Sequence, residues 1–349
     1  MRILFLGFNF LGSNAKGLAE GFRANGHLVN LVDAYKAEPM WSDFCGKVLH
    51  RLLMFQILRS YQQMVLREDA LMESDLVVVA KGHLLEASTL RKLRERGRKC
   101  VLFYPDVSLL NHGKRIPQCL PLYDYIFTTK TFHLPILRER FHNPNACFMP
   151  HAAIEALHRK IRLDDRLRGL FGSDVSYVAQ RSAKKEMYMR ELVRAFPEID
   201  LKIWGPGWQR CSCPELQSHI VRQNPPFGDL YVAVVNATKI NLAVMNEAVK
   251  ESPSGDNITS RTFHIPSCGG FMLHERTPEI GLYYEEKKEI DCFDDPEELA
   301  QKVRYYLARE EERERMREAA YQRTHRENMW QHRAAFIEQT LYEHGILSH

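Results

Sequence analysis

Hydrophobic and polar positions alternate between two kinds of segment along the chain. Short runs rich in β-branched and aromatic residues are separated by longer stretches with apolar residues at helical spacing. This alternation is typical of parallel sheets covered by helices on both faces. In residues 1–150 the pattern predicts one doubly wound sheet, whose strands are RILFL, HLVNLV, DLVVVA, CVLFYP, YDYIFTT and ACFMP.

A second series of strands follows a polar, basic joint at residues 158–169. Its expected members are DVSYVA, DLKIWG, HIVR, KINLAVM, GGFML and KEIDCF. From Asp295 onward the pattern is helical and charged, and the last helix carries a partial apolar stripe that can pack back on the first domain. The predicted fold class is therefore α/β, with one Rossmann-like domain at 1–158, a second at 170–325, and a helix at 326–349 that crosses back.

Composition agrees with two cores in a globular protein: the chain has 349 residues, of which 45% are hydrophobic and 26% charged. A net charge of +4 suits small anionic ligands, and we expect no nucleic acid. The eight cysteines form no disulfide framework and no zinc-ligand spacing, so we expect a reducing cytoplasm and no metal site. The start, MRILFLGFNFLG, reads as a buried strand rather than a signal peptide.

The turn after the first strand contains glycines at positions 7, 12 and 17. Their spacing does not fit the dinucleotide fingerprint, which argues against a nicotinamide-dependent oxidoreductase, and the chain has no Walker A motif. Ser13 or Asn14 can cap the next helix, whose free N–H groups would attract phosphate. Gly12 and Ser13 are therefore candidate donor-binding residues, although a tight turn without a ligand explains them equally well.

Basic residues follow the first strand of the second domain, at the strand end where open α/β sheets bind ligands. They are Arg181, Lys184 and Lys185. The chain has no Asp-x-Asp pair to hold a metal, so these bases and backbone dipoles would neutralise a nucleotide diphosphate. The alternative is a solvated helix start. The rigid loops in LKIWGPGW and NPPFG either hold a flat base or serve as structural turns.

The stretch DNITSRTFHIPSCGG, residues 256–270, predicts a loop, a cap at Thr259 or Ser260, and a short helix ended by CGG. Arg261 and His264 are three positions apart, so they share the face of its first turn, where an anion would sit. In the first domain, Lys81 and His83 follow one strand and Asp106 follows another. Asp106 either orients an acceptor hydroxyl, acts as a base, or caps its turn.

The segment from SRTFHIPSCGGFMLHE to DPEELAQKVRYYL closely resembles the C-terminal domain of CgeB-like glycosyltransferases, a spore-maturation group. The similarity extends through YDYIFTTKTFHLPILRERF, ACFMPHAA, DVSYVAQR and LKIWGPGW, roughly residues 75–340. It implies the GT-B architecture, with two Rossmann-like domains facing a cleft, a nucleotide-sugar donor on the second and a hydroxyl acceptor on the first. It also implies a metal-independent, retaining transferase that has no cofactor beyond its nucleotide-sugar co-substrate.

The resemblance also suggests roles for single residues. Asp256 and His264 stand where such enzymes carry two glutamates, one near the transferred sugar and one on the ribose. Histidine cannot accept two hydroxyl protons as a carboxylate does, so His264 leaves open a non-catalytic protein on a degenerate GT-B scaffold. Similar enzymes have a histidine near the donor sugar at the position of His83, although a histidine after a strand can also be structural. The candidate catalytic residues are therefore His83 and Asp106. The candidate donor-binding residues are Gly12, Ser13, Arg181, Lys184, Lys185, Asp256, Asn257, Arg261, His264, Gly269 and Gly270.

Residues 47–67 are basic and apolar and contain no acid. They predict a helix half-buried in the core with a basic outer face. The same composition is compatible with peripheral contact to an anionic membrane, or with grip on an acceptor. No apolar run in the chain approaches the length that crosses a bilayer.

Overall fold

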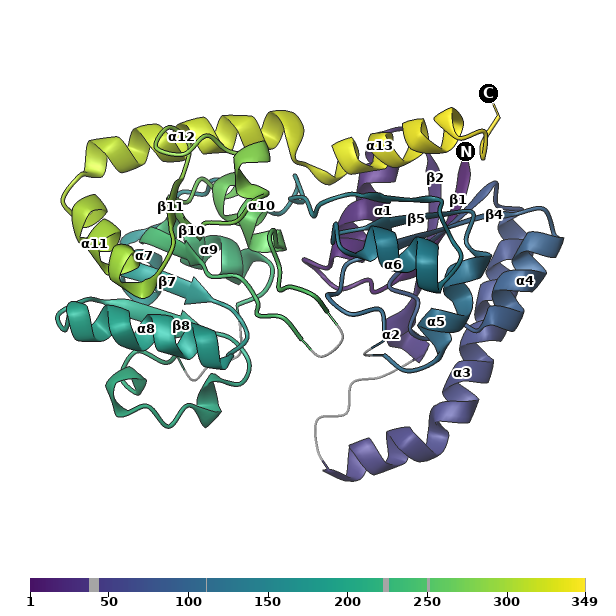
Figure 1. Cartoon of the computed structure of the whole chain (residues 1–349), viewed down its shortest axis with the longest axis horizontal. Coiled ribbons are helices and arrows are strands. Elements are labelled where there is room, and N and C mark those ends of the chain that lie inside the picture. The colour runs from purple at the N-terminus through teal and green to yellow at the C-terminus, as the bar shows by residue number, and fades with distance from the viewer. Residues whose placement is uncertain (38–43, 111, 222–225, 250–251, 349) are drawn as a thin grey trace. The chain divides into compact units, whose positions relative to one another are not determined.

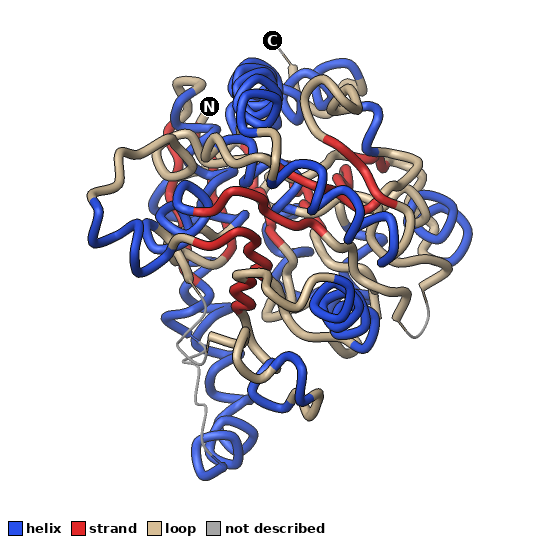
Figure 2. Tube along the Cα trace, turned by 90° about the vertical axis from the view of Figure 1, so that its left-hand side faces the viewer, coloured by secondary structure: helices blue, strands red, loops and turns tan. Residues whose placement is uncertain are grey.

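The computed structural model describes residues 1–37, 44–110, 112–221, 226–249 and 252–348 (Figure 1). The chain divides into two compact units. Unit 1 comprises Met1–His151, Val249–Ser254 and Trp330–His349. Unit 2 comprises Ala152–Ala248 and Gly255–Met329. Strands lie among helices (Figure 2), as the predicted α/β pattern requires.

Unit 1 is built on a six-stranded parallel sheet of order β2-β1-β3-β4-β5-β6. Its strands are β1 (Arg2–Gly7), β2 (Leu28–Asp33), β3 (Leu76–Ala80), β4 (Lys99–Tyr104), β5 (Tyr125–Thr128) and β6 (Ala146–Phe148). Its helices are α1 (Asn14–Ala24), α2 (Ala34–Ala37), α3 (Phe44–Met72), α4 (Ala87–Glu95), α5 (Arg115–Cys119), η1 (Leu120–Leu122), α6 (His133–Arg140) and α13 (Trp330–Glu343). The six predicted strands are confirmed, and the strand order reverses between β1 and β3.

Unit 2 is built on a five-stranded parallel sheet of order β11-β10-β9-β7-β8. Its strands are β7 (Ser173–Val178), β8 (Leu201–Trp204), β9 (Thr238–Ala243), β10 (Met272–Glu275) and β11 (Asp291–Phe293). Its helices are α7 (Asp165–Phe171), α8 (Ala183–Ala195), η2 (Trp208–Arg210), η3 (Pro214–Leu216), α9 (Asp229–Ala237), α10 (Ser260–Ser267), η4 (Ile280–Leu282), α11 (Pro296–Leu307) and α12 (Glu310–Glu327). The strand order reverses between β7 and β9, so the crevice that open sheets offer to ligands is expected there.

The segment HIVR, predicted as a strand, does not form one. Ile220 makes only an isolated bridge to Ile203. The Ile203 amide donates to the His219 carbonyl at 2.9 Å, and the Val221 amide donates to the Ile203 carbonyl at 2.9 Å. The described part of the segment, residues 219–221, therefore pairs through Ile220 alone.

The last helix packs on unit 1, as its apolar stripe predicted. Trp330, Ala334, Ile337 and Leu341 of α13 are buried. α13 lies close against α1 at Gly21, where an added Cβ would come within 2.5 Å of the Trp330 carbonyl oxygen. A glycine at this point of α1 therefore lets the two backbones approach.

Gly205 ends β8 with a φ of 134°, and a Cβ there would lie 2.1 Å from the Ala179 carbonyl oxygen. We expect Gly205→Ala to lower the free energy of unfolding by about 3 kcal/mol, because it adds backbone strain to a backbone clash. Chemical denaturation measures this. The matched control is Gly169→Ala in α7, where a Cβ meets nothing within 4 Å, so stability should hold or rise slightly. Equal stability of the two variants would contradict the prediction.

Candidate functional site

The carboxyl edge of the unit 2 sheet gathers charged side chains at the point where the strand order reverses. Arg261, in the first turn of α10, lies over the ends of β7 and β9. Its Nη2 donates to the Val244 carbonyl at 2.9 Å, and its Nη1 reaches the Val178 carbonyl at 3.5 Å. The guanidinium carbon lies 5.9 Å from the centre of the Tyr177 ring. The fold therefore fixes this cation in the crevice where a doubly wound sheet binds ligands.

Several buried polar atoms of unit 2 have no hydrogen-bond partner among the described residues. They include Nε of Arg261, the hydroxyl oxygen of Tyr231 in the first turn of α9, Nε1 of Trp204 and Oγ1 of Thr259. Buried polar groups in native proteins are nearly always paired, so the unpaired Nε of Arg261, at the reversal of strand order, is a candidate ligand contact. Tyr231 was missed in the sequence, because it stands in an apolar helix.

Lys184 and Glu275 form an ion pair across the same edge, with Nζ and Oε1 2.5 Å apart. Glu275 also accepts a hydrogen bond from the Met245 amide at 2.8 Å. Glu247 accepts one from the Lys184 amide at 2.6 Å, at the start of α8. Both carboxylates were missed in the sequence. Each of these acids stands at or just after the end of a strand, which could have marked it as a candidate site residue. Only the strand order of the folded sheet, however, brings residues 184 and 275 together.

Lys185 lies beneath this edge with only 2% of its surface exposed. Its ammonium donates to the Gln180 carbonyl at 3.2 Å and to Oδ1 of Asn246. The amide of Asn246 in turn donates to the carboxylate of Asp256, which is buried. Burial, assisted by the positive charge of Arg261, lowers the pKa of Lys185 to about 8. Lys185 therefore adds positive potential from below the surface.

The stability of the protein should rise with pH because of Lys185. Its pKa falls from 10.5 to about 8 on folding, so between these values the unfolded chain holds a proton that the folded chain has lost. The cost of burying the charge, about 3 kcal/mol at neutral pH, is relieved across this window. We expect the unfolding free energy of the wild type to rise relative to Lys185→Met between pH 8 and 10.5. Parallel denaturation curves with a constant difference would contradict this.

His264, three positions after Arg261 on α10, also contacts the segment that precedes α7. Its Nε2 donates to the Ala152 carbonyl at 3.2 Å, and its ring stacks on His158 at 3.8 Å between centroids. Burial lowers the pKa of His264 to about 3, so the ring is neutral at pH 7. His158 accepts a hydrogen bond from the Ile154 amide at 2.9 Å. His264 therefore carries no charge toward a diphosphate and is held by the segment that precedes α7.

The remaining candidates in unit 2 lie around this edge. Arg181 binds Oε2 of Glu186 through Nε at 2.5 Å, and its amide donates to the Pro206 carbonyl. The side-chain amide of Asn257 donates to Oε1 of Glu279 at 3.0 Å. Gly269 and Gly270 end α10, and their amides donate to the carbonyls of Pro266 and Ile265, respectively. Gly269 has a φ of +71°, the left-handed conformation usual after a helix.

Trp208 is a core residue. It is 1% exposed, and its Nε1 donates to the Ala179 carbonyl at 2.8 Å. Of the two alternatives for the loop LKIWGPGW, this contact supports the structural turn. Part of the loop NPPFG lies outside the described residues, since the description resumes at residue 226.

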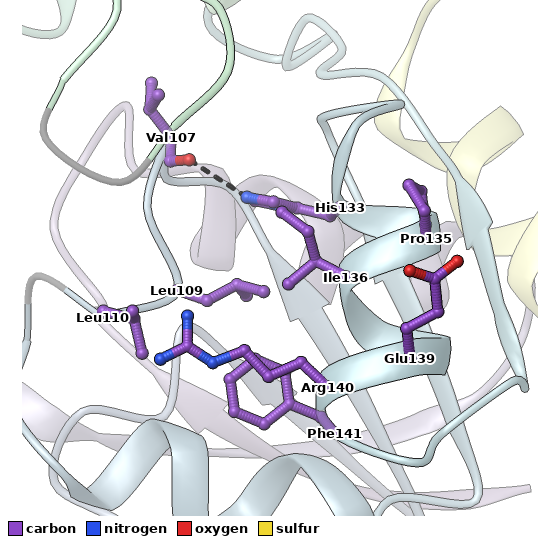
Figure 3. A pocket seen from close by; sticks show the side chains of 9 residues that line it. All are labelled: Val107, Leu109, Leu110, His133, Pro135, Ile136, Glu139, Arg140 and Phe141. Atoms are coloured by element: carbon purple, nitrogen blue, oxygen red, sulfur yellow. Dashed lines mark hydrogen bonds between the residues drawn. The ribbon is translucent and has the colours of Figure 1, made fainter.

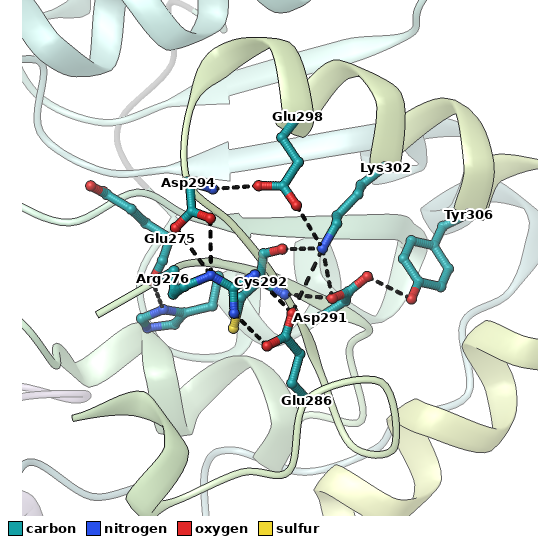
Figure 4. A network of polar contacts seen from close by, with 10 residues as sticks. Glu275, Arg276, Glu286, Asp291, Cys292, Asp294, Glu298, Lys302 and Tyr306 are labelled. Carbon is teal, nitrogen blue, oxygen red and sulfur yellow. Dashed lines mark hydrogen bonds and ion pairs between the residues drawn. The ribbon is translucent and has the colours of Figure 1, made fainter. Parts of the chain in front are cut away.

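An ion-pair network joins the carboxyl end of β10 to both ends of the short strand β11 (Figure 4). Arg276 pairs with Asp294 at 3.0 Å and with Glu286. Lys302 of α11 pairs with Asp291 at 2.9 Å, and Asp291 also accepts a hydrogen bond from the Tyr306 hydroxyl at 2.8 Å. Arg276 is thus occupied within the fold. The network fixes the strand end that carries Glu275, which is the partner of Lys184.

Unit 1 carries a second polar cluster, at the carboxyl edge of β3 and β4. Asp106 binds Nζ of Lys81 at 2.9 Å and Nε2 of His112 at 2.7 Å. Burial raises the pKa of Asp106, but the hydrogen bond from His112 and the charge of Lys81 outweigh it and hold the pKa below its usual range. Lys81 has a φ of +69°, a strained conformation for a lysine. His112 was missed in the sequence.

His83 lies beside this cluster, near the reversal of strand order between β1 and β3. Its ring stacks on Phe8 at 5.3 Å and lies 6.5 Å from the ring of His112. The turn after β1 also holds Gly12, with a φ of 87°, and Ser13, the N-cap of α1. Oγ of Ser13 donates to the Phe8 carbonyl at 2.7 Å and accepts from the Lys16 amide at 3.1 Å. The unit 1 candidates therefore share one sheet edge.

Comparison with known proteins agrees with this architecture. A family model described as glycosyl transferase-like matches residues 181–339. No curated protein matches the sequence. Sucrose-phosphate synthase from Thermosynechococcus elongatus is 13% identical with a TM-score of 0.67, over 99% of this chain and 100% of that one. A glycosyltransferase from Rickettsia africae is 10% identical with a TM-score of 0.66, over 98% of each chain.

Anabaena Alr3699/HepE, solved with UDP and with UDP-glucose, is 12% identical with a TM-score of 0.63. The similarity covers 98% of this chain and 100% of that one. With its two Rossmann-like units, the chain therefore has the predicted GT-B fold. The range matched by the glycosyl transferase-like family model, residues 181–339, includes Arg181, Lys184, Lys185 and Arg261.

Two further observations concern the residues that the structure describes. Among them, no group of three His, Cys, Asp or Glu side chains is arranged to hold a metal ion. None of the described helices is both long and apolar enough to cross a membrane.

Proposed function

We propose that this protein is a CgeB-like glycosyltransferase that moves a sugar from a nucleotide diphosphate to a hydroxyl group, without a metal and with retention of configuration. The observation that carries the proposal is Arg261, fixed over the ends of β7 and β9 with a buried Nε that has no partner among the described residues. Lys184 and Lys185 add positive charge at the same edge. Such groups stabilise the charge that grows on a departing diphosphate.

The neighbouring structures suggest which nucleotide to test first. Alr3699/HepE was solved with UDP and with UDP-glucose, so uridine nucleotides should be tested first. In the proposed reaction the acceptor oxygen bonds to the sugar carbon, the bond to the diphosphate oxygen breaks, and the acceptor proton leaves with the nucleotide diphosphate. Asp106 and His83 of unit 1 would position the acceptor hydroxyl. The proposed setting is the cytoplasm.

Binding and hydrolysis of UDP-, GDP-, ADP- and dTDP-sugars by the purified protein would test the proposal. Calorimetry gives the affinity, and NMR of the sugar product in the presence of EDTA reports both metal independence and the configuration at the anomeric carbon. We expect one nucleotide to bind and its sugar to be released slowly in the absence of acceptor. Failure to bind or hydrolyse any member of the panel would refute the proposal.

A second candidate function is a non-catalytic, nucleotide-binding protein on the same scaffold. The observation that favours it is His264, which is neutral and bonded to Ala152, where the resemblance implies a carboxylate for the ribose. This candidate predicts nucleotide binding without hydrolysis or transfer across the panel. Turnover of any donor would exclude it.

We also propose that α3 contacts an anionic membrane surface. One side of this helix is buried in unit 1, as expected for the predicted half-buried helix. The buried residues are Ile57, Leu58, Tyr61 and Val65. Leu52 and Phe55 are 75% and 74% exposed, and the exposed Arg51 and Arg59 flank them. An exposed apolar pair between cations fits the interface of an anionic bilayer.

Leu52→Ser with Phe55→Ser should weaken binding to phosphatidylglycerol vesicles by about tenfold or more, because two large apolar side chains no longer enter the bilayer. Vesicle co-sedimentation measures this, with phosphatidylcholine vesicles as the neutral comparison. Leu71→Ser is the matched control, since Leu71 is 73% exposed near the other end of α3, beside Asp69 and Glu73. Equal binding by the double variant and the wild type would contradict the proposed contact.

A further inference from the structure

A cavity of about 210 Å³ lies in unit 1 between α6 and the loop that follows β4. Figure 3 shows Leu109, Ile136, Arg140 and Phe141 around one space, near the hydrogen bond between His133 and Val107. β4 ends at Tyr104, and α6 follows β5, so the cavity opens at the carboxyl edge of the sheet. This is the edge on which Asp106 lies.

The interior of the cavity is apolar. Val107, Leu109, Leu110, Ile136 and Phe141 line it with hydrocarbon. His133, the one titratable side chain deep in the wall, already uses both ring nitrogens. Its Nε2 donates to the Val107 carbonyl at 3.0 Å, and its Nδ1 accepts from the Thr128 hydroxyl at 2.6 Å.

The protonation state of His133 determines which class of ligand the cavity can bind. Burial lowers the pKa of His133 to about 4, so the ring is neutral at pH 7. His133 therefore offers neither charge nor a vacant ring nitrogen to a ligand. A sugar or phosphate buried there would lose its hydrogen bonds to water without replacement, whereas a hydrocarbon group would gain from leaving water.

The size of the cavity narrows the choice of hydrocarbon. A cavity of roughly 150 Å³ with similar walls accommodates one benzene molecule, so about 210 Å³ takes a single substituted ring rather than a long chain. Phe141 offers that ring an aromatic neighbour, which favours an aromatic over an aliphatic occupant. The charged side chains of the lining, Glu139 and Arg140, are exposed. They are therefore expected at the mouth.

We propose that this cavity binds the aromatic ring of the acceptor, so that the acceptor is an aryl compound that bears a hydroxyl group. Val107 of the cavity directly follows Asp106, which binds Lys81 and His112. A ring held by Val107, Leu109 and Ile136 thus lies beside the polar cluster that would position its hydroxyl. The identity of the occupant as the acceptor rests on the proposed glycosyl transfer, whereas the affinity of the cavity for an aromatic ring does not.

The test uses 4-fluorophenol as the probe and ¹⁹F NMR as the measurement, on the full chain without any nucleotide. We expect the wild type to bind the probe and Ile136→Phe, which fills the cavity, to bind it about tenfold more weakly or worse. Arg138→Gln is the matched control, because Arg138 lies on α6, is exposed and does not line the cavity. Its affinity should equal that of the wild type.

A second variant distinguishes a filled cavity from misfolding of Ile136→Phe. Ile136→Ala enlarges the cavity and should shift preference from 4-fluorophenol toward 2-naphthol, which a merely damaged protein would not do. Absence of probe binding by the wild type, equal binding by Ile136→Phe, or an unchanged preference in Ile136→Ala would overturn the inference. Since no nucleotide is present, failure of donor binding in the sugar-nucleotide panel is a separate result.

Discussion

Arg261→Ala is expected to weaken binding of the nucleotide diphosphate by between about tenfold and a hundredfold. A hydrogen bond from a charged donor contributes about 1.5–3 kcal/mol, and each 1.4 kcal/mol is a factor of ten. The guanidinium lies where the order of strands reverses, and its Nε is buried without a partner among the described residues. Calorimetric titration with UDP, or with whichever nucleotide binds, gives the loss directly.

Further substitutions at and around Arg261 separate the effect of its charge from the effect of its planar shape. Arg261→Lys keeps the charge but loses the planar fork, so its affinity should fall between those of the wild type and the alanine variant. Tyr231→Phe removes another buried polar atom that has no partner among the described residues. It should lower the affinity less, because a neutral hydroxyl makes a weaker hydrogen bond. Lys239→Ala serves as the control. Lys239 is exposed at the opposite, amino end of β9, where it pairs with Asp174 at 2.8 Å.

A structural role for Arg261 would give a different result. Its guanidinium also holds the carbonyls of Val178 and Val244, so truncation should lower the melting temperature as well. If the alanine variant melts lower but binds nucleotide as tightly as the wild type, then Arg261 only ties α10 to the sheet. The donor site would then have to lie elsewhere.

Sequence patterning predicted the fold because both sheets are made of short apolar runs that end at turns. The one wrong strand, HIVR, has an apolar core of two residues and is followed by two prolines. The β propensity of this segment does not reveal that, among its described residues, Ile220 alone forms a β-bridge, to Ile203. Pairing partners for so short a segment depend on where the preceding loop leads, which periodicity does not record.

Only part of the candidate site could be predicted from the sequence, because some of its contacts join residues that are far apart along the chain. Lys184 was predicted because cations that follow a strand of a doubly wound sheet reach its carboxyl edge, and Arg261 because it falls in the first turn of a short helix. Glu275 was missed because its partner is 91 residues away and the two meet only through the strand order. Helical spacing put His264 on the face of Arg261, but it did not show the contacts of His264 with Ala152 and His158. Those two residues come from a segment without regular structure, whose path no local pattern reveals.

Asp106→Asn should reduce sugar transfer by about two to four orders of magnitude, the range that a positioned acid or base contributes. The carboxylate holds Lys81 at 2.9 Å and His112 at 2.7 Å, and an amide cannot replace its charge. The affinity for nucleotide should stay unchanged, because Arg261, Lys184 and Lys185, the cations proposed to bind the diphosphate, belong to unit 2 and Asp106 belongs to unit 1. Steady-state transfer rates and calorimetric affinity, measured on the same preparation, separate the two effects.

The pH dependence of stability gives an independent check on Asp106. Its pKa is lower in the folded protein than in the unfolded chain, so its stabilising contribution is present above about pH 4 and is lost as pH falls through the folded value. The wild type should therefore melt above Asp106→Asn at pH 7, and the difference should shrink in acid. Asp75→Asn is the matched control, because Asp75 is ion-paired with Arg2 at 3.2 Å near the amino end of β3. It should alter stability in the same sense and leave transfer intact, whereas equal loss of transfer in both variants would mean that Asp106 acts only through the fold.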